Sequence, residues 1–454
     1  MVLVKSISGI RGTLENVPGQ SLSNEDILKI VLSYIKEVVN ISSQNTVIIG
    51  RDARPSGKRI NKLIVKILLQ NGVNVIDLGL ATTPTIGIYV KTHSASGGII
   101  ISASHNTIEW NALKLLNNEG EFLNKEIAEK IINSNNKNYN VVEKQGEYRF
   151  EENALQEHID KILALDIVNI KSIKSQHYNV IVDGINSVGG IAVPKLLNKL
   201  GVRNIYQLNC NPNGAFAHNP EPIPENIMQI RNIMQKQNYD FGIVVDPDVD
   251  RLCFLDNTGT PVGEEYTLVL AAKHVLEKQN KKTTCSNLSS TMALRKITQS
   301  LGGQYFTSAV GEINVVEKMK QSNAVIGGEG NGGVIYPETH YGRDALVGIA
   351  LILSLLSEKN ISLLQIKKQM PQYFISKKKV IFDKDFELIV NKLKKEYVHY
   401  NIINIDGIKA ERDEEWFHVR KSNTEPVVRI YAEASSIDAA DLLAKEILDK
   451  IKTI

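Results

Sequence analysis

A pattern of helix, glycine and strand recurs three times along the chain, and it limits the fold more than any other feature. Each copy consists of an amphipathic helical run, a glycine and an apolar strand. The copies are residues 60–80 turning at Gly72, residues 191–209 turning at Gly201, and residues 292–310 turning at Gly302 and Gly303. A glycine just past a helix suits the left-handed position that ends many helices. The repetition predicts three related α/β domains.

Three apolar strands beside these repeats lead into polar turns. They read TVIIGRD from Thr46, YNVIVDG from Tyr178 and FGIVVDPD from Phe241. Strands that alternate with helices build layered α/β domains, and such domains bind ligands at the carboxyl ends of their strands. We therefore expect functional residues in these turns.

The last part of the chain has a different pattern. From about Ser376 it contains a short strand, a charged helical run over 386–397, a β-rich stretch over 416–434 and a final helical run over 439–451. That order is typical of a small α+β domain. The expected domains are residues 1–150, 151–255 and 256–370, all α/β, and residues 371–454, α+β.

Composition excludes several functional classes. A chain of 454 residues has the length of three or four domains, and its 43% hydrophobic and 23% charged residues are those of an ordinary soluble protein. The net charge of +3, with both signs mixed, argues against a nucleic-acid face or a polybasic membrane anchor. Apolar runs stay below the roughly 18 residues of a membrane span, and the N-terminus lacks a signal-peptide pattern. The three cysteines form no paired motif, so we expect a cytoplasmic protein.

The stretch FGIVVDPDVDRLCFLD has three aspartates, Asp246, Asp248 and Asp250, in a turn between two apolar strands. Two unit charges ~4 Å apart repel by about 4 kcal/mol at an effective dielectric constant near ~20. Converging carboxylates therefore need a cation, and hard oxygen ligands select Mg²⁺ or Ca²⁺. An EF-hand is excluded because its sixth and twelfth positions are Arg251 and Asn257 here. We predict a Mg²⁺ site with Arg251 directed at an anion; the alternative is a turn whose acids point into solvent.

A second polar turn, SASHN over 102–106, follows the apolar run Ile99–Ile101, which reads as a buried strand. Ser102 and Ser104 are both candidate nucleophiles. Taken alone, the stretch is better explained as a polar turn that leaves a sheet. Whether one of these serines is a nucleophile depends on the residues that the fold brings beside this turn.

The last domain carries RKSNTEPVVR over 420–429. Guanidinium forks and short hydroxyl or amide side chains match phosphate oxygens, and neither a metal-ligand set nor a nucleophile lies among them. We predict a phosphate-binding loop made of Arg420, Ser422, Asn423, Thr424 and Arg429. The alternative is an exposed loop with an Arg420–Glu425 ion pair.

A glycine-rich stretch, GGEGNGG over 327–333, satisfies the pattern G-x-G-x-x-G. A dinucleotide fingerprint must open a helix, whereas β-branched residues and Pro337 follow here. A loop that presents the carboxylate of Glu329 and the amide of Asn331 suits the vicinal hydroxyls of a sugar. A plain glycine-rich turn explains the stretch equally well.

Near the N-terminus, GIRG and GRDARPSG place Arg11, Arg51 and Arg54 beside glycines that let a ligand approach the backbone. An ion pair between Arg51 and Asp52 is an equally good explanation of the second stretch.

In this order and spacing, the five motifs resemble those of the α-D-phosphohexomutase superfamily over essentially the full chain. Its members include phosphoglucomutases, phosphomannomutases and phosphoglucosamine mutases. The resemblance implies three α/β domains and a fourth α+β domain around a central cleft. It implies Ser104 as the phosphoserine, His105 in contact with its phosphate, and Mg²⁺ held by Asp246, Asp248, Asp250 and an oxygen of phosphorylated Ser104.

The resemblance implies roles for the remaining motif residues too. Lys114 is the expected general acid/base, with Arg11 as the partner that lowers its pKa, and Arg251 joins the catalytic set. The reaction would pass through phosphorylated Ser104 and a hexose 1,6-bisphosphate. The sugar-specificity loop matches Glu329 and Asn331, and the loop for the unreactive phosphate matches Arg420, Ser422, Asn423, Thr424 and Arg429.

The sugar loop departs from the family, since many members carry Ser at the position of Asn331 and His at that of Gly333. The opening KSISGIRGT and the Asn331 loop look most like bacterial amino-sugar members. We expect a phosphoglucosamine mutase that interconverts glucosamine 6-phosphate and glucosamine 1-phosphate; the alternative in the family is a phosphomannomutase/phosphoglucomutase.

Two other functional classes stay open at this point. One is a Mg²⁺-dependent sugar-phosphate phosphatase that uses water as the acceptor, and the other is a non-catalytic phosphosugar sensor. A sensor would be expected to lack one of the reactive groups, and all are present. The expected partner is a small sugar phosphate, and the expected assembly is a monomer or homodimer.

Overall fold

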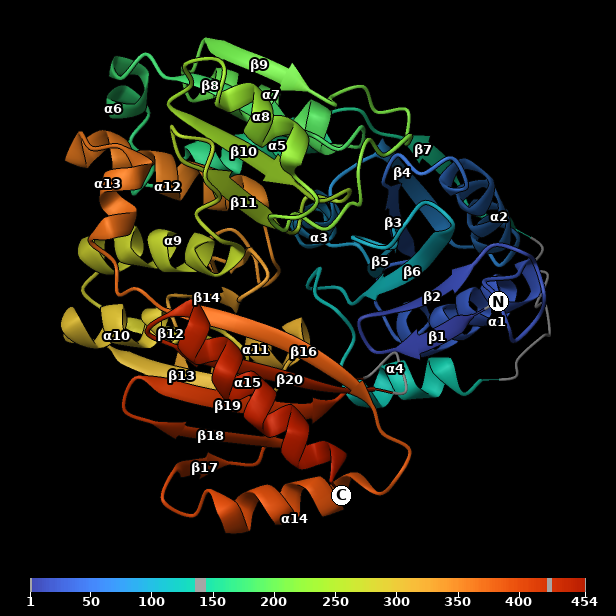
Figure 1. Cartoon of the computed structure of the whole chain (residues 1–454). Coiled ribbons are helices and arrows are strands. Elements are labelled where there is room, and N and C mark those ends of the chain that lie inside the picture. The colour runs from blue at the N-terminus through green and yellow to red at the C-terminus, as the bar shows by residue number, and fades with distance from the viewer. Residues whose placement is uncertain (1, 135–143, 423–426, 454) are drawn as a thin grey trace.

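The computed structural model describes residues 2–134, 144–422 and 427–453. Four β-sheets follow one another along the chain, with helices packed on them (Figure 1). The first three sheets belong to α/β domains and the fourth to a C-terminal α+β domain, so the predicted fold class is confirmed. The predicted boundaries near 150, 255 and 370 fall between strands of different sheets and stay predictions.

The first domain has a seven-stranded sheet in the order β1-β2-β6-β5-β3-β4-β7. Its strands are β1 (Leu3–Ser6), β2 (Gly9–Thr13), β3 (Thr46–Arg51), β4 (Asn74–Leu80), β5 (Gly97–Ile101), β6 (Trp110–Leu116) and β7 (Tyr148–Phe150). Its helices are α1 (Asn24–Tyr34), the π-helical turn η1 (Ile35–Val39), α2 (Gly57–Gln70), α3 (Thr83–Thr92) and α4 (Lys125–Ile132).

The second domain has a four-stranded sheet in the order β11-β10-β8-β9. Its strands are β8 (Asn179–Asp183), β9 (Asn204–Leu208), β10 (Phe241–Val245) and β11 (Leu252–Leu255), and its helices are α5 (Ala154–Leu163), α6 (Ile170–Ser175), α7 (Gly189–Lys199) and α8 (Met228–Met234).

The third domain repeats that arrangement in the order β13-β12-β14-β15. Its strands are β12 (Thr283–Asn287), β13 (Gln304–Ser308), β14 (Ile326–Glu329) and β15 (Gly333–Ile335). Its helices are α9 (Glu264–Lys278), α10 (Ala293–Ser300), α11 (Glu312–Ser322), α12 (Ala345–Lys359) and α13 (Leu363–Lys368).

One supersecondary unit is common to these three domains. A helix ends at a left-handed glycine and leads to a parallel strand, as the repeat predicts: φ is 77° at Gly72, 91° at Gly201 and 77° at Gly302. Another parallel strand then turns back into an antiparallel neighbour, giving the pairs β5–β6, β10–β11 and β14–β15. The three turns hold SASHN, the aspartates and the glycine-rich loop, so each motif occupies an equivalent place in its domain.

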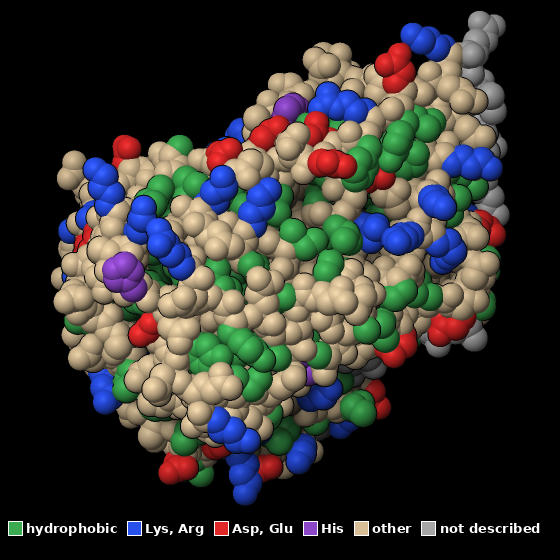
Figure 2. Space-filling model, turned by 90° about the horizontal axis from the view of Figure 1, so that it is seen from above, with side chains coloured by type: hydrophobic (Ala, Val, Ile, Leu, Met, Phe, Trp, Pro, Cys, Tyr) green, Lys and Arg blue, Asp and Glu red, His purple; other side chains and the backbone are tan. Residues whose placement is uncertain are grey.

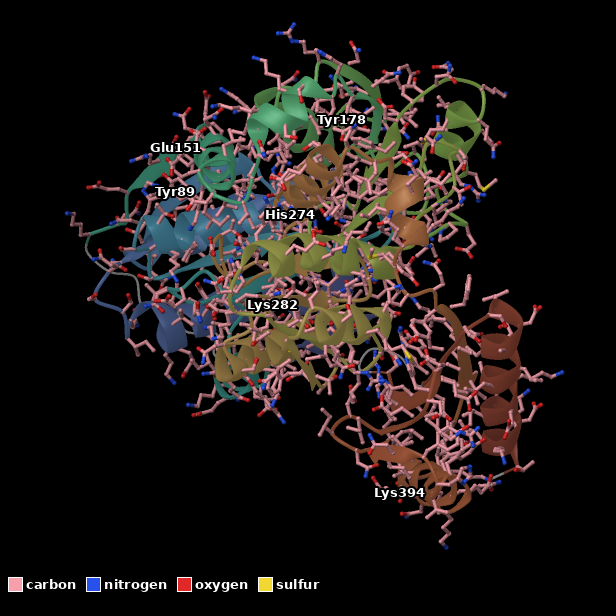
Figure 3. The ribbon with its side chains drawn as sticks, turned by 90° about the vertical axis from the view of Figure 1, so that its left-hand side faces the viewer. Tyr89, Glu151, Tyr178, His274, Lys282 and Lys394 are labelled. Carbon is pink, nitrogen blue, oxygen red and sulfur yellow. The ribbon has the colours of Figure 1, made fainter. Side chains whose placement is uncertain are left out.

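The fourth domain has an antiparallel sheet in the order β16-β20-β19-β18-β17. Trp416 is fully buried on the face toward the third domain, and α14 and α15 pack with the sheet through a separate apolar core. Figure 3 shows this domain, with Lys394 on α14, as a lobe beside the third domain. Its elements are β16 (Phe374–Ile381), α14 (Phe386–Glu396), β17 (Asn401–Ile403), β18 (Ile408–Arg412), β19 (Glu415–Lys421), β20 (Val427–Ala434) and α15 (Ile437–Lys452).

The surface agrees with the mixed composition. Basic and acidic side chains are interspersed on the face shown in Figure 2. Among the described residues, the helices are all too short or too polar for a bilayer span.

Candidate active site

Ser104 lies in the turn between β5 and β6, and a hydrogen-bonded chain fixes its backbone. Its φ is 50°, a left-handed value that a residue with a side chain adopts only under constraint. The Ser104 N–H donates to Ser102 Oγ at 2.9 Å, and the Ser102 hydroxyl donates to Asp52 Oδ2 at 2.7 Å. Ser102 therefore supports Ser104.

Arg54 holds the rest of this turn. Its guanidinium is fully buried, pairs with Asp52 at 3.0 Å and donates to the backbone carbonyls of Ser104 and Asn106, each at 2.6 Å. It donates to two further carbonyls, those of Thr107 and Trp110. The ion pair considered for Arg51 with Asp52 is wrong, because Arg51 donates to the backbone carbonyl of Asp52 and Arg54 takes the carboxylate. The stretch GRDARPSG pointed to Arg54 as a residue beside a ligand, but it did not predict the bonds from Arg54 to the Ser104 turn.

The three aspartates converge in the turn between β10 and β11. All three are fully buried, so the alternative in which they point into solvent is wrong. Asp246 Oδ1 accepts the backbone N–H groups of Asp250 and Arg251, each at 3.1 Å. Its other oxygen accepts the Ser104 hydroxyl at 2.7 Å, which brings two motifs 142 residues apart into contact.

The carboxylate oxygens fit a divalent cation. One oxygen from each of Asp246, Asp248 and Asp250 lies within 4.8 Å of the others. Within the described part of the chain, Asp248 Oδ1 and Asp250 Oδ1 are buried and accept no hydrogen bond. Buried carboxylate oxygens normally have a donor, and hard oxygens are the ligands that Mg²⁺ prefers. These residues would hold the metal.

Lys114, on β6, reaches the same carboxylates. Its Nζ lies 2.5 Å from Asp248 Oδ2 and 3.3 Å from Asp250 Oδ2, and Thr83 Oγ1 donates to the same Asp248 oxygen at 2.6 Å. Burial disfavours the charge, but the two carboxylates outweigh it and raise the pKa of Lys114 above its usual value. The predicted lowering of this pKa by Arg11 is therefore wrong, because the aspartates are its immediate neighbours.

Three further donors, Arg11, His105 and Arg251, lie near the Ser104 turn. Arg11 Nη1 donates to Asn106 Oδ1 at 3.1 Å, and His105 Nδ1 lies 3.5 Å from Ser104 Oγ. Burial, with the charges of Arg251 and Arg11, holds the pKa of His105 well below its usual value, so the imidazole is neutral. Arg251 Nη1 donates to Glu221 Oε1 at 3.0 Å, so the anion it faces here belongs to the protein.

The glycine-rich loop joins β14 to β15 and opens no helix, as predicted for a loop unrelated to dinucleotide binding. Glu329 is buried, and its Oε1 accepts Asn287 Nδ2 at 2.9 Å and the Gly311 N–H at 3.1 Å. Its Oε2 pairs with Arg343 Nη1 at 3.0 Å. Arg343 pairs with Asp250 as well, and the sequence patterns did not single it out.

The described members of the predicted phosphate set, Arg420, Ser422 and Arg429, lie on two neighbouring strands of the fourth domain and the turn after the first of them. Arg420 on β19 and Arg429 on β20 are direct cross-strand partners, and Arg420 is largely buried, which contradicts an exposed loop at its position. Two guanidinium groups opposite each other repel, and an anion between them would offset that repulsion. The Ser422 N–H donates to Val427 O at 2.9 Å; Asn423, Thr424 and Glu425 lie outside the described residues.

Family models match all four parts of the chain. They are the phosphoglucomutase/phosphomannomutase α/β/α domains I, II and III at residues 4–141, 156–259 and 263–374, and the C-terminal domain at residues 379–450. The chain belongs to this phosphoglucomutase/phosphomannomutase family, and the predicted family resemblance is confirmed. Phosphohexomutases are isomerases, so the predicted enzyme class is confirmed.

Two curated phosphohexomutases cover nearly the whole chain. A "Phosphoglucomutase/phosphomannomutase" of Thermococcus kodakarensis is 32% identical over 95% of this chain and 94% of its own. A "Phosphoglucosamine/phosphogalactosamine mutase" of Sulfurisphaera tokodaii is 31% identical over 92% and 94%. The crystal structure of a phosphoglucomutase/phosphomannomutase family protein from Burkholderia thailandensis has the same fold, with a TM-score of 0.83, 22% identity and coverage of 100% and 98%.

Proposed function

We propose that the protein is a phosphoglucosamine mutase that interconverts glucosamine 6-phosphate and glucosamine 1-phosphate, in the cytoplasm and as a monomer or homodimer. The 2.7 Å hydrogen bond between Ser104 Oγ and Asp246 Oδ2 carries the proposal, because it sets a hydroxyl able to carry a phosphoryl group against the candidate cation site. The amino-sugar assignment draws on the Asn331 loop and on the relative from Sulfurisphaera tokodaii.

The proposed reaction consists of two phosphoryl transfers. In the first, the phosphorus–oxygen bond to Ser104 breaks and a bond to a sugar hydroxyl oxygen forms, while the hydroxyl proton is exchanged through Lys114 and restores the serine hydroxyl. The hexose 1,6-bisphosphate then reorients within the site, and its other phosphoryl group is transferred back to Ser104. No outside reactant is needed, since each transfer exchanges one proton for one phosphoryl group.

The surrounding side chains have complementary roles in this proposal. Arg11 and the neutral His105 donate to phosphate oxygens on Ser104, and Arg251 contributes positive charge. Mg²⁺, when held by Asp246, Asp248, Asp250 and a Ser104 phosphate oxygen, offsets the charge of the transferred group.

The ends of the substrate are held by other loops. Glu329 and Asn331 bind sugar hydroxyls, and the unreactive phosphate binds to Arg420, Ser422, Asn423, Thr424 and Arg429. The same phosphate loop would serve both orientations of the intermediate.

A substrate panel tests the sugar. With Mg²⁺ and a trace of the matching bisphosphate, we expect kcat/KM for glucosamine 1-phosphate to exceed those for glucose 1-phosphate and mannose 1-phosphate by at least about tenfold. Chelation of the metal should abolish all three activities. Equal or better turnover of glucose or mannose 1-phosphate would favour the alternative, a phosphomannomutase/phosphoglucomutase, which the relative from Thermococcus kodakarensis supports.

A further inference from the structure

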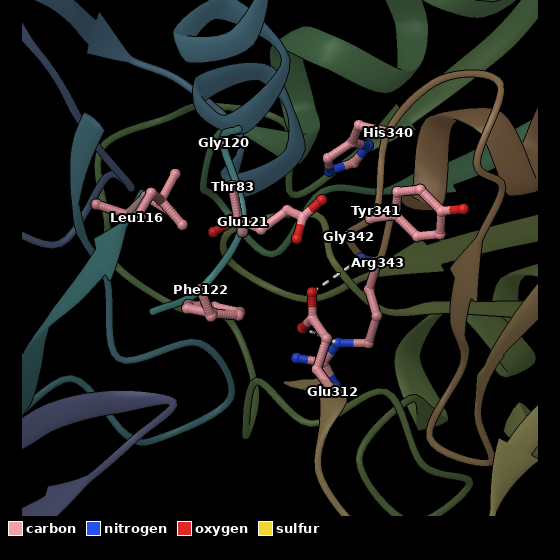
Figure 4. A pocket seen from close by; sticks show the side chains of 11 residues that line it. Thr83, Leu116, Gly120, Glu121, Phe122, Glu312, His340, Tyr341, Gly342 and Arg343 are labelled. Carbon is pink, nitrogen blue, oxygen red and sulfur yellow. Dashed lines mark hydrogen bonds and ion pairs between the residues drawn. The ribbon is translucent and has the colours of Figure 1, made fainter. Parts of the chain in front are cut away.

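Arg343 bonds to three carboxylates from three different loops. Its Nη2 lies 2.7 Å from Asp250 Oδ2 in the metal loop, and its Nη1 lies 3.0 Å from Glu329 Oε2 in the sugar loop. Its Nε lies 2.9 Å from Glu312 Oε2 at the start of α11, a contact visible in Figure 4. One planar group therefore joins the second domain to two loops of the third.

The backbone around Arg343 is anchored, so the guanidinium projects from a fixed base. Its own N–H donates to Glu312 Oε1 at 3.1 Å. The next residue, Asp344, caps α12 by accepting the N–H groups of Leu346 and Val347, and His158 Nε2 lies 2.9 Å from its other oxygen. The Arg343 side chain is only 10% exposed, which leaves it little room for another conformation.

Gly333 makes room for the stem of this arginine. A Cβ atom at position 333 would collide with Arg343 Cδ, and Gly333 is not among the residues with left-handed φ. The backbone conformation at 333 would thus accept alanine, and the main obstacle is the Arg343 stem, with a lesser one from Asn331 Oδ1 at 3.1 Å. The Arg343 side chain therefore needs glycine at position 333.

The charges make the arrangement costly to disturb. Without the guanidinium, Glu312, Glu329 and Asp250 would each lose one cationic donor beside a buried carboxylate, and only the backbone N–H of residue 343 would still donate to Glu312. Lysine has one nitrogen in place of the rigid fork and cannot span three carboxylates.

We propose that Arg343 is a positioning residue that holds the sugar loop in register with the metal loop, and that Gly333 is glycine because the arginine stem fills the space beside it. The proposal rests on the proposed function only in taking Glu329 as a sugar-binding group. Its structural part, the pairing of Gly333 with Arg343, is independent of which sugar is turned over.

A double-mutant cycle tests the pairing. The full-length variants are Gly333→Ala, Arg343→Ala and the double variant, each measured with Mg²⁺ for thermal unfolding and for KM and kcat on whichever hexose 1-phosphate the wild type uses best. We expect each single variant to unfold at a lower temperature and to raise KM by about tenfold or more. Adding Gly333→Ala to Arg343→Ala should lower the melting temperature far less than adding it to the wild type, because the colliding stem is gone and only the 3.1 Å approach to Asn331 Oδ1 is left.

The matched control is Arg295→Lys, at an arginine of the same domain that pairs with the single carboxylate of Glu411. We expect it to leave KM unchanged, whereas Arg343→Lys should raise it. A Gly333→Ala effect of the same size with and without Arg343 would overturn the pairing. A fall in kcat with unchanged KM in the Arg343 variants would overturn the positioning role. A smaller fraction of folded enzyme by itself lowers the apparent kcat and leaves KM unchanged. Melting temperatures report the pairing even if the sugar assignment fails.

Discussion

The cluster around Ser104 and the three aspartates differs in construction from the arginine cluster of the fourth domain. The turn between β5 and β6 is bonded to the turn between β10 and β11 through Ser104–Asp246, and Lys114 on β6 reaches Asp248 in that second turn. Arg343, just before α12, joins Asp250 of the same turn to Glu329 at the glycine-rich loop. The arginines of the fourth domain instead sit on neighbouring strands of one antiparallel sheet. That domain joins the third through buried Trp416 and through polar contacts such as Lys409 Nζ to Leu288 O at 2.9 Å.

The difference suits the proposed chemistry. A group that carries a phosphoryl needs a fixed position, because small misplacements of reacting atoms cost large factors in rate. A group that only holds the far phosphate must accommodate both orientations of an intermediate. Variants of Ser104 and of the residues that hold its turn should therefore lower kcat, and variants of the fourth-domain arginines should raise KM.

The largest effect is expected for Ser104→Ala. Loss of the phosphoryl carrier should lower mutase turnover by at least about 10⁴-fold. The matched control Ser102→Ala removes a supporting hydrogen bond and should cost about tenfold. Intact-mass measurement should find one added phosphate in the wild type and none in Ser104→Ala. Full activity of Ser104→Ala with release of inorganic phosphate would identify a phosphatase.

Arg54→Lys should have the next largest effect. Lysine cannot reproduce the contacts to four backbone carbonyls and Asp52, and a buried ion pair that loses its geometry destabilises by about 3 kcal/mol. We expect kcat to fall about 10²-fold as the Ser104 turn shifts. Arg149→Lys changes an exposed arginine and should alter neither unfolding nor kcat. Equal behaviour of the two variants would mean that Arg54 does not hold the turn.

Arg420→Gln addresses the fourth domain. Removing one charged donor to a phosphate costs about 1.5–3 kcal/mol, so KM for the sugar phosphate should rise about 10–100-fold. Because the reacting centre is untouched, kcat should stay within about threefold. Lys395→Gln on the exposed side of α14 is the control and should change neither constant. A fall in kcat with constant KM would place Arg420 outside the phosphate loop.

The smallest effect concerns the junction between the third and fourth domains. His418 is buried, with Nδ1 2.9 Å from Ser289 Oγ, and burial lowers its pKa to about 3. In the unfolded chain the imidazole has its ordinary pKa of 6.5. The contribution of the neutral imidazole to the free energy of unfolding is therefore at its full value above that pH. It is lost as pH falls toward the folded pKa, at about 1.4 kcal/mol per pH unit.

Going from pH 7.5 to 5.5 should thus lower the melting temperature of the wild type more than that of His418→Gln, which does not titrate. Exposed His399→Gln serves as the control and should follow the wild type. The same pH dependence in all three proteins would contradict a buried neutral His418.

Patterns local to a few residues predicted much of the molecule. The glycines at 72, 201 and 302 marked helix ends because they adopt left-handed φ, and the apolar runs before SASHN and the aspartates became buried strands. The same patterns pointed to the candidate residues in the turns that end these strands, and the family resemblance supplied the roles of Ser104 and Lys114.

The long-range partners were not predictable in this way. Asp250 and Arg343 are 93 residues apart, and Lys114 and Asp248 are 134 apart. The family resemblance pointed to Arg11 as the neighbour that sets the pKa of Lys114, and packing brought two aspartates there instead. Arg54 was noticed beside its glycine, but its four carbonyl acceptors exist only once the Ser104 turn is folded.

The sequence by itself determined the repeated α/β units, the turn that each unit offers and the kind of chemistry placed in each turn, because turn residues and hydrophobic periodicity act over a few residues. The tertiary structure decided which charges face each other, and so the protonation of Lys114, the open oxygens of Asp248 and Asp250, and the place of Arg343. Electrostatic energy depends on distance and burial, and both arise only when remote segments pack together.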